Sequence, residues 1–234
     1  MTFKLTDIVP WGRSAHEYQR MFNLSNSDLT SRILDCGAGP ASFTAEMTAQ
    51  GYSVIACDPL YQFTAADIEQ RIQTVCPQIM TGVDQTRDRF VWSQIRSLAE
   101  LETLRMNAMQ RFLQDLPTGQ AAGRYVVGKL PTLPFGDRSF NLALSSHLLF
   151  TYSDQLSAEL HVAALRELLR VAGEVRIFPI VENFTGARSP HLDPVIRQLQ
   201  PVVQSLEIVT VDYEFQRNGN QMLRLVAGDP EAAM

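Results

Sequence analysis

Two aspartates follow short apolar runs of the sequence. Asp35 lies in the run ILDCGAGPASF, two residues before Gly37, and Gly39 follows at the next alternate position. A carboxylate here would repel the pyrophosphate that a dinucleotide-binding loop holds, but it suits a cationic group such as an α-ammonium. Because Ser42 stands where the G-x-G-x-x-G pattern needs its third glycine, a nicotinamide-dependent oxidoreductase is disfavoured.

Asp58 ends the second such run, SVIACDPLY. A carboxylate after a buried strand can accept hydrogen bonds from both hydroxyls of a ribose, and Pro59, Leu60 and Tyr61 offer an apolar surface for a purine. The two aspartates together indicate a ligand with an ammonium group, a ribose and a base but no phosphate, which is the composition of S-adenosylmethionine. The alternative for both is solvation at a strand end or helix capping.

Four stretches carry a resemblance to a known family. They are ILDCGAGPASF, SVIACDPLY, LPTLPFGDRSFNLALSSHLLF and LLRVAGEVRIFPI, and they resemble strand segments of class I S-adenosylmethionine-dependent methyltransferases. The resemblance covers residues 32–58 and 125–228 and identifies no subfamily. It implies an α/β fold with a doubly wound, seven-stranded, mostly parallel sheet and an antiparallel C-terminal hairpin. It also implies transfer of a methyl group from a sulfonium to a nucleophile.

The resemblance implies roles for individual residues. Asp35 and the glycine loop would line the methionine part of the cofactor, Asp58 would bind the ribose, and the carbonyl of Ser145 would accept from the ammonium group. Lys129 stands where many relatives have an acid for the adenine amino group, so backbone atoms near it are expected to contact the adenine. The full set of expected cofactor-binding residues is Asp35, Gly37, Ala38, Gly39, Asp58, Pro59, Leu60, Lys129, Leu130 and Ser145.

His147 is the candidate catalytic residue. It follows the fourth expected strand, and an imidazole with an ordinary pKa near 6.5 can act as a general base. A packed or substrate-orienting histidine is an equally good interpretation, and Tyr152 and Asp154 are weaker candidates nearby. In the leader, Arg13 and Tyr18 either belong to a helix packed on the sheet or reach the cofactor carboxylate or the substrate.

Strands and helices must position these residues. Short β-prone runs alternate with helical stretches from the ILDC run onward, which predicts a parallel sheet covered by helices on both faces. Asn218 and Gly219 favour a tight turn, so the last two strands are expected to be antiparallel. Residues 62–124 predict a helical insertion after the second strand, with Ser97 as an N-cap and Pro77 kinking or ending the first helix. The insertion either covers the active site as a lid or forms a homodimer interface.

Composition and charge limit the remaining classes. The 234 residues suit a single domain, 1–234, with a leader at 1–30. A net charge of −5 without a basic run disfavours nucleic acid, and no apolar run approaches the roughly 20 residues that span a membrane. The N-terminus lacks the apolar core of a secretory signal, and the three cysteines have no metal-ligand spacing, so we expect a cytoplasmic protein without a metal.

The function that these observations predict is transfer of a methyl group from S-adenosylmethionine to a small-molecule acceptor. The alternative is a catalytically inactive regulatory or scaffold protein that binds the same cofactor.

Overall fold

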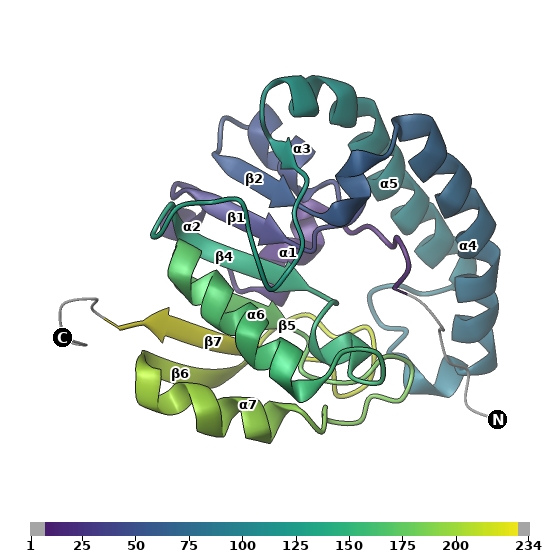
Figure 1. Cartoon of the computed structure of the whole chain (residues 1–234). Coiled ribbons are helices and arrows are strands. Elements are labelled where there is room, and N and C mark those ends of the chain that lie inside the picture. The colour runs from purple at the N-terminus through teal and green to yellow at the C-terminus, as the bar shows by residue number, and fades with distance from the viewer. Residues whose placement is uncertain (1–7, 229–234) are drawn as a thin grey trace.

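The computed structural model describes residues 8–228 and shows a seven-stranded sheet between two layers of helices (Figure 1). The strand order is β3-β2-β1-β4-β5-β7-β6. Only β7 is antiparallel to its neighbours, whereas the other pairs are parallel. The predicted doubly wound, seven-stranded, mostly parallel sheet with an antiparallel C-terminal hairpin is therefore confirmed. The strands are β1 Ile33–Cys36, β2 Val54–Cys57, β3 Tyr125–Val126, β4 Phe140–Ser146, β5 Ala172–Phe178, β6 Val203–Thr210 and β7 Gln221–Ala227.

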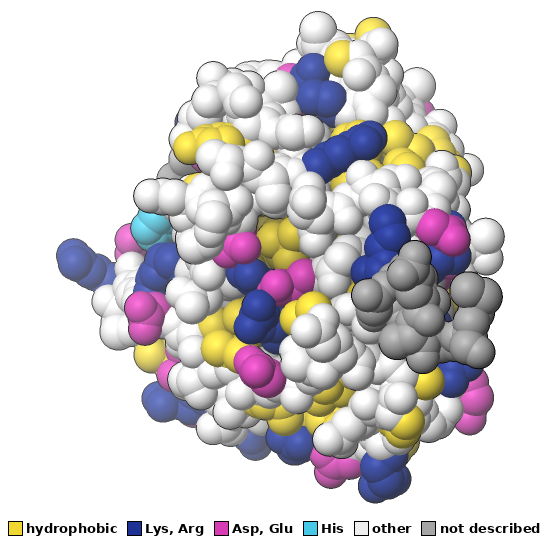
Figure 2. Space-filling view, turned by 90° about the vertical axis from the view of Figure 1, so that its left-hand side faces the viewer, with side chains coloured by type: hydrophobic (Ala, Val, Ile, Leu, Met, Phe, Trp, Pro, Cys, Tyr) yellow, Lys and Arg dark blue, Asp and Glu magenta, His cyan; other side chains and the backbone are white. Residues whose placement is uncertain are grey.

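Helices cover both faces of the sheet and bury a separate core on each. One core joins the apolar sides of α6 and α7 to β4, β5 and β7, and the other joins α1 and α3 to the opposite face. On the molecular face seen in Figure 2, basic side chains are interspersed with acidic ones. The helices are α1 Ala15–Met21, α2 Asn26–Leu29, α3 Phe43–Ala49, α4 Ala65–Gln85, α5 Leu98–Ala121, α6 Ala158–Val171 and α7 Leu192–Leu199, with short 3-10 turns η1 Pro59–Gln62, η2 Arg87–Arg89, η3 Phe150–Tyr152 and η4 Gln200–Val202.

Residues 62–124 form α4, η2 and α5 between β2 and β3. The long helix α5 contacts α3 and β3 and so takes the place of the crossover helix, while α4 packs along α5 (Figure 1). Ser97 is the predicted N-cap of α5 and accepts a hydrogen bond from the Glu100 backbone N–H. The apolar faces of both helices are buried within the chain.

Pro77 does not end α4, so that part of the prediction is wrong. The helix continues to Gln85, and its buried stripe runs on both sides of the proline, from Ile68 and Ile72 to Ile79 and Val83. Proline removes one backbone hydrogen bond from a helix, and the packing of this stripe against α5 and its surroundings outweighs that loss.

The connection between β6 and β7 reaches across to the link between α4 and α5. The Val91 N–H donates to the Phe215 carbonyl at 2.7 Å, and the Arg217 N–H donates to the Arg89 carbonyl at 2.8 Å. Asn218 has the left-handed backbone, φ 65°, that the predicted turn requires. These hydrogen bonds join the C-terminal hairpin to the insertion and close one end of the space above the sheet.

Candidate functional site

A cavity of about 460 Å³ lies at the carboxyl ends of β1, β2 and β4. This volume is in the range of small-ligand pockets, roughly 300–1,000 Å³. Its walls come from the loops after these three strands, the leader, the helices α4 and α5, and the two loops that precede α7 and β7. The edge of a parallel sheet at which strands end is where ligands bind in such folds.

The glycine loop after β1 forms the central wall. Gly37 and Gly39 have φ values of 68° and 53°, in the left-handed region that glycine tolerates. A Cβ at Gly37 would lie 2.4 Å from Leu148 Cδ2, whereas a Cβ at Gly39 would meet no atom within 4 Å. With Ala38, the two glycines line the cavity and leave the loop backbone open to a ligand.

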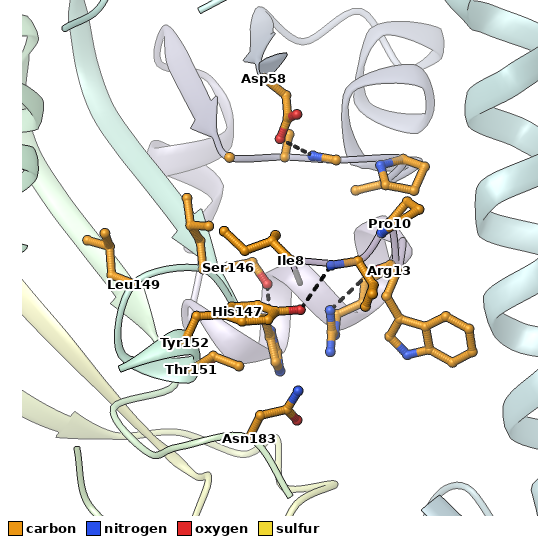
Figure 3. A pocket seen from close by; sticks show the side chains of 18 of the residues that line it. Ile8, Pro10, Arg13, Asp58, Ser146, His147, Leu149, Thr151, Tyr152 and Asn183 are labelled. Atoms are coloured by element: carbon orange, nitrogen blue, oxygen red, sulfur yellow. Dashed lines mark hydrogen bonds between the residues drawn. The ribbon is translucent and has the colours of Figure 1, made fainter. Parts of the chain in front are cut away.

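Asp58 lies at one end of the cavity, as Figure 3 shows. One of its carboxylate oxygens accepts from the Gly39 N–H at 2.9 Å and the other from the Leu60 N–H at 2.7 Å. The capping alternative is thus realised at η1, yet each oxygen keeps further acceptor capacity. Burial raises the pKa of Asp58 although these two N–H groups lower it. Pro59 and Leu60 line the cavity beside it.

Asp35 lies just behind the cavity wall and is completely buried. The Tyr18 hydroxyl, which lines the cavity, donates to Oδ1 at 3.2 Å, and Oδ2 has no partner within residues 8–228. Burial raises the pKa of Asp35 to about 8, and the nearby charge of Asp58 adds to this effect. Ser145 is likewise fully buried, and its neighbours Ser146 and His147 line the cavity in its place.

Lys129 and Leu130 line the cavity on the side of Asp58. Lys129 is exposed and its carbonyl accepts from the Thr132 N–H at 3.0 Å, so this backbone oxygen belongs to a turn. Leu130 is buried. The structure brings eight of the ten expected cofactor-binding residues to the cavity wall and leaves two, Asp35 and Ser145, behind it.

His147 lies between the two ends of the cavity, with a left-handed backbone at φ 51°. Its Nδ1 is 2.8 Å from Ser146 Oγ, and its backbone N–H donates to the Phe178 carbonyl at 2.6 Å. Burial lowers its pKa well below the ordinary value, and the charges of Arg13 and Arg105 lower it further. The imidazole is therefore neutral near pH 7.

The far end of the cavity contains a buried ionic network that sequence reasoning missed. Arg105 of α5 donates to Glu17 of α1 at 2.7 Å, and the Tyr213 hydroxyl donates to the other Glu17 oxygen at 2.8 Å. Although burial raises it, the charges of Arg105 and Arg13 hold the pKa of Glu17 at about 2. One signal for this network is present in the sequence. Arg105 lies four residues after Leu101 and is therefore a charged residue on the buried, otherwise apolar side of α5.

The leader passes over the cavity. Ile8, Val9, Pro10 and Trp11 all line it, and the Val9 N–H donates to the Tyr152 hydroxyl at 3.3 Å (Figure 3). The side chains of Thr151 and Asn183 lie below this contact in the same view.

Residues 8–228 contain neither a membrane-spanning helix nor a metal-binding cluster. No helix in that range combines the length and the apolar character that a membrane span needs. The same range holds no cluster of three His, Cys, Asp or Glu side chains that could bind a metal ion.

Comparisons with solved structures returned methyltransferases of low sequence identity. A TehB-like SAM-dependent methyltransferase from Corynebacterium glutamicum has a TM-score of 0.45 and 16% identity, over 92% of this chain and 86% of that chain. A SAM-dependent methyltransferase from Methanosarcina mazei has a TM-score of 0.42 and 14% identity, over 85% of this chain and 91% of that chain. The fold assignment rests on the strand order and directions themselves.

No protein-family model matches this chain. Its sequence is 31% identical, over 224 residues, to uncharacterized protein MJ0045 of Methanocaldococcus jannaschii. The similarity covers 94% of this chain and 96% of that protein. This chain therefore belongs to the same family as MJ0045.

Proposed function

We propose that this protein binds S-adenosylmethionine and transfers its methyl group to a small-molecule acceptor. The observation that carries the proposal is a pair of carboxylates, fully buried Asp35 and half-buried Asp58, near the ends of adjacent strands on either side of the glycine loop. The bound cofactor would supply an activated methyl group on its sulfonium. The residues of this chain would bind the cofactor, orient the acceptor and exclude water.

The site around Asp35 suits a cationic group. A carboxyl with a pKa of about 8 and an oxygen without a partner is only partly ionised near neutral pH. A ligand ammonium close to it would favour the ionised form, because an opposite charge offsets the cost of burial. The Tyr18 hydroxyl already holds one oxygen in place, which fixes the orientation of the carboxylate.

The site around Asp58 suits a ribose. Two backbone N–H groups hold its oxygens 2.9 Å and 2.7 Å away and so fix the carboxylate plane. The remaining acceptor capacity can serve two vicinal hydroxyls. Leu60 and Phe63 line the cavity next to Asp58 and offer apolar surface for a base.

The acceptor half of the cavity favours a small molecule with an apolar body. Its walls are contributed mainly by apolar side chains of the insertion and of the two loops that precede α7 and β7: Ile79, Val83, Phe90, Leu101, Phe184 and Phe215. The leader crosses above this space, and the bond from Val9 to Tyr152 holds it there. A chamber closed in this way would exclude water and select acceptors by shape.

His147 would face the acceptor. Its neutral imidazole can accept a hydrogen bond or a proton from the nucleophile, and the Ser146 hydroxyl would orient the ring. Because its pKa is lowered, His147 would serve best for an acceptor that needs little help to ionise.

Calorimetric titration with S-adenosylhomocysteine, 5′-methylthioadenosine and NADH tests the cofactor assignment. The proposal expects saturable binding of the first two and none of NADH. Binding of NADH alone, or of none of the three, would contradict it. Incubation with S-adenosylmethionine and a panel of apolar acceptors then separates an enzyme from an inactive binding protein, which would never yield S-adenosylhomocysteine.

A further inference from the structure

Arg13 has a fixed backbone and a side chain that lines the cavity. Gly12, just before it, passes so close to the glycine loop that a Cβ would lie 2.1 Å from the Pro40 carbonyl oxygen. The Arg13 carbonyl accepts from the Ser42 N–H at 3.0 Å, and Ser14 caps α1. The position of this arginine is therefore set from both sides by α1 and the glycine loop.

The Arg13 guanidinium has no anionic partner within residues 8–228. Its one hydrogen bond there runs from Nη1 to the Trp11 carbonyl at 3.2 Å, and its Nε is buried without a partner. Burial lowers the pKa of Arg13, and the charge of Arg105 lowers it further. A half-buried guanidinium with a buried, unpartnered Nε is stabilised when an anion binds to it.

Glu17, the carboxylate whose charge raises the pKa of Arg13, is already engaged. Glu17 accepts from Arg105, from the Tyr213 hydroxyl and from both the N–H and the hydroxyl of Ser14, so its two oxygens serve four donors. Two guanidinium groups, Arg13 and Arg105, thus line the same cavity, and among the described residues the Glu17 carboxylate pairs with Arg105 alone. The charge that is left over belongs to Arg13, which forms no ion pair with Glu17.

The surroundings of Arg13 suit a planar anion. In the view of Figure 3 its guanidinium lies to the right of Tyr152 and above Asn183, on the side away from Asp58. Asn183, which also lines the cavity, can donate through its amide. The fork of an arginine matches a carboxylate with two parallel hydrogen bonds.

We infer that Arg13 is the carboxylate-binding residue of this cavity. The inference rests on the proposed function in one respect: that function offers two ligands that could present a carboxylate, the amino-acid end of the cofactor and the acceptor. The chemistry at Arg13 is the same in both cases, and binding measurements distinguish the two sources.

The first measurement compares S-adenosylhomocysteine with its decarboxylated counterpart, which keeps the amine. If Arg13 binds the cofactor, the wild-type protein prefers the carboxylate form by roughly tenfold to a hundredfold, and Arg13→Gln removes the preference. Arg13→Lys keeps the charge but not the fork, and should keep part of the preference. The control, Arg111→Gln, changes an arginine whose side chain is 63% exposed on α5 and should leave the preference unchanged.

The second measurement uses acetate and benzoate against their amides, acetamide and benzamide, with and without saturating S-adenosylhomocysteine. If Arg13 binds the acceptor, the saturated wild-type protein prefers the carboxylates, and Arg13→Gln abolishes this preference while cofactor affinity stays unchanged. The inference is overturned if the wild-type protein prefers a carboxylate in neither measurement. It is also overturned if every carboxylate preference that the wild-type protein shows survives in Arg13→Gln.

5′-Methylthioadenosine separates failure of this inference from failure of the proposed function. It lacks both the carboxylate and the amine, so its affinity should not depend on Arg13. A protein that binds it equally well in wild-type and Arg13→Gln forms keeps the proposed function, whatever the carboxylate measurements show. Circular dichroism and thermal unfolding of both Arg13 variants establish that they are folded, and Arg13→Lys carries the test if Arg13→Gln is not.

Discussion

The two ends of the cavity are built in different ways. The end around Asp58 comes mainly from one continuous stretch of chain, residues 35–60, in which each of two neighbouring parallel strands has a carboxylate at or near its end. Lys129 and Leu130 add to the wall beside Asp58. The end around Arg105 is assembled from the leader, α5 and the connection between β6 and β7. Sequence neighbours form the first end, and tertiary packing forms the second.

Because the two ends are built differently, we expect residues of the first end to affect ligand binding and residues of the second end to affect the stability of the fold. At the first end backbone N–H groups hold Asp58 and a tyrosine hydroxyl holds Asp35, and Asp58 keeps acceptor capacity at the cavity wall. At the second end Glu17 and Arg105 satisfy each other in the interior, so they hold three segments of the chain together. Substitutions at the two ends should therefore affect different measurements.

Arg105→Met should give the largest effect, a loss of about 3–5 kcal/mol in the free energy of unfolding, because it leaves the buried Glu17 carboxylate without its cation. Urea unfolding at pH 7 measures it. Arg111→Met on the same helix removes a largely exposed arginine and should cost less than about 1 kcal/mol. The double variant Glu17→Gln, Arg105→Met should recover part of the loss, since no unpaired charge remains. Equal losses in the free energy of unfolding for Arg105→Met and Arg111→Met would contradict the stabilising role of the Glu17–Arg105 pair.

The pH dependence of this network has a definite sign. The pKa of Glu17 in the folded protein is about 2, below its ordinary value of 4.5. Its contribution to stability is therefore complete above about pH 4.5 and is lost as the pH falls toward 2. In Arg105→Met this acid-side loss should shrink, because the cation that lowers the pKa most is gone.

The sequence predicts the first end of the cavity much better than the second. Asp35, the glycine loop and Asp58 could be placed because a strand, a tight turn and a helix are local structures with local signals. The parallel sheet followed from the alternation of elements, and the antiparallel hairpin followed from the Asn218 turn. The strand order itself was not predicted. The surroundings of the two carboxylates could not be predicted, because no local sequence signal shows that Asp35 is fully buried and bound to the Tyr18 hydroxyl.

The second end could not be predicted because it depends on contacts between distant segments. Glu17 and Tyr213 are 196 positions apart, and they meet only because the hairpin connection lies against the insertion. Pro77 was misread for a related reason: the buried stripe of α4 stabilises the helix on both sides of the proline, and its packing partners lie elsewhere in the chain. Arg105 was the one local sign, a charge on an apolar stripe.

Asp58→Asn should weaken binding of S-adenosylhomocysteine by about 1.5–3 kcal/mol, because an amide nitrogen replaces one carboxylate oxygen and the charge is lost. Calorimetry on the folded variant measures it, and 5′-methylthioadenosine should lose affinity to a similar extent. Asp137→Asn, which changes a carboxylate that is 76% exposed, serves as the control. An unchanged dissociation constant would remove Asp58 from the ribose site.

Asp35 should make cofactor binding depend on pH. With a pKa of about 8, its carboxyl must release a proton when an ammonium binds, so affinity for S-adenosylhomocysteine should rise by up to about tenfold per pH unit from pH 6 and level off above pH 8. 5′-Methylthioadenosine has no ammonium and should show a flat profile. Parallel profiles for the two ligands would exclude Asp35 from the ammonium site.

The stability effect of Asp35 has the opposite direction from that of Glu17. Its pKa is raised in the folded protein from an ordinary value of 3.8 to about 8, so the folded state loses stability as the pH rises between these values. Asp35→Asn should therefore unfold at a higher temperature than the wild-type protein at pH 8 while binding S-adenosylhomocysteine more weakly. Thermal unfolding followed by circular dichroism measures the first effect and calorimetry the second.

His147 lies between the two ends, and its substitution should have the smallest effect on cofactor binding. His147→Asn keeps a residue that tolerates the left-handed backbone at φ 51°, so the loop after β4 should hold its shape. Affinity for S-adenosylhomocysteine should stay within about threefold, equivalent to roughly 0.7 kcal/mol. With an acceptor in hand, loss of a general base would lower kcat by roughly 10²–10⁴, and a loss below tenfold would exclude that role. A large loss of cofactor affinity would instead place the imidazole beside the cofactor, so that the cofactor would occupy the cavity from Asp58 as far as His147.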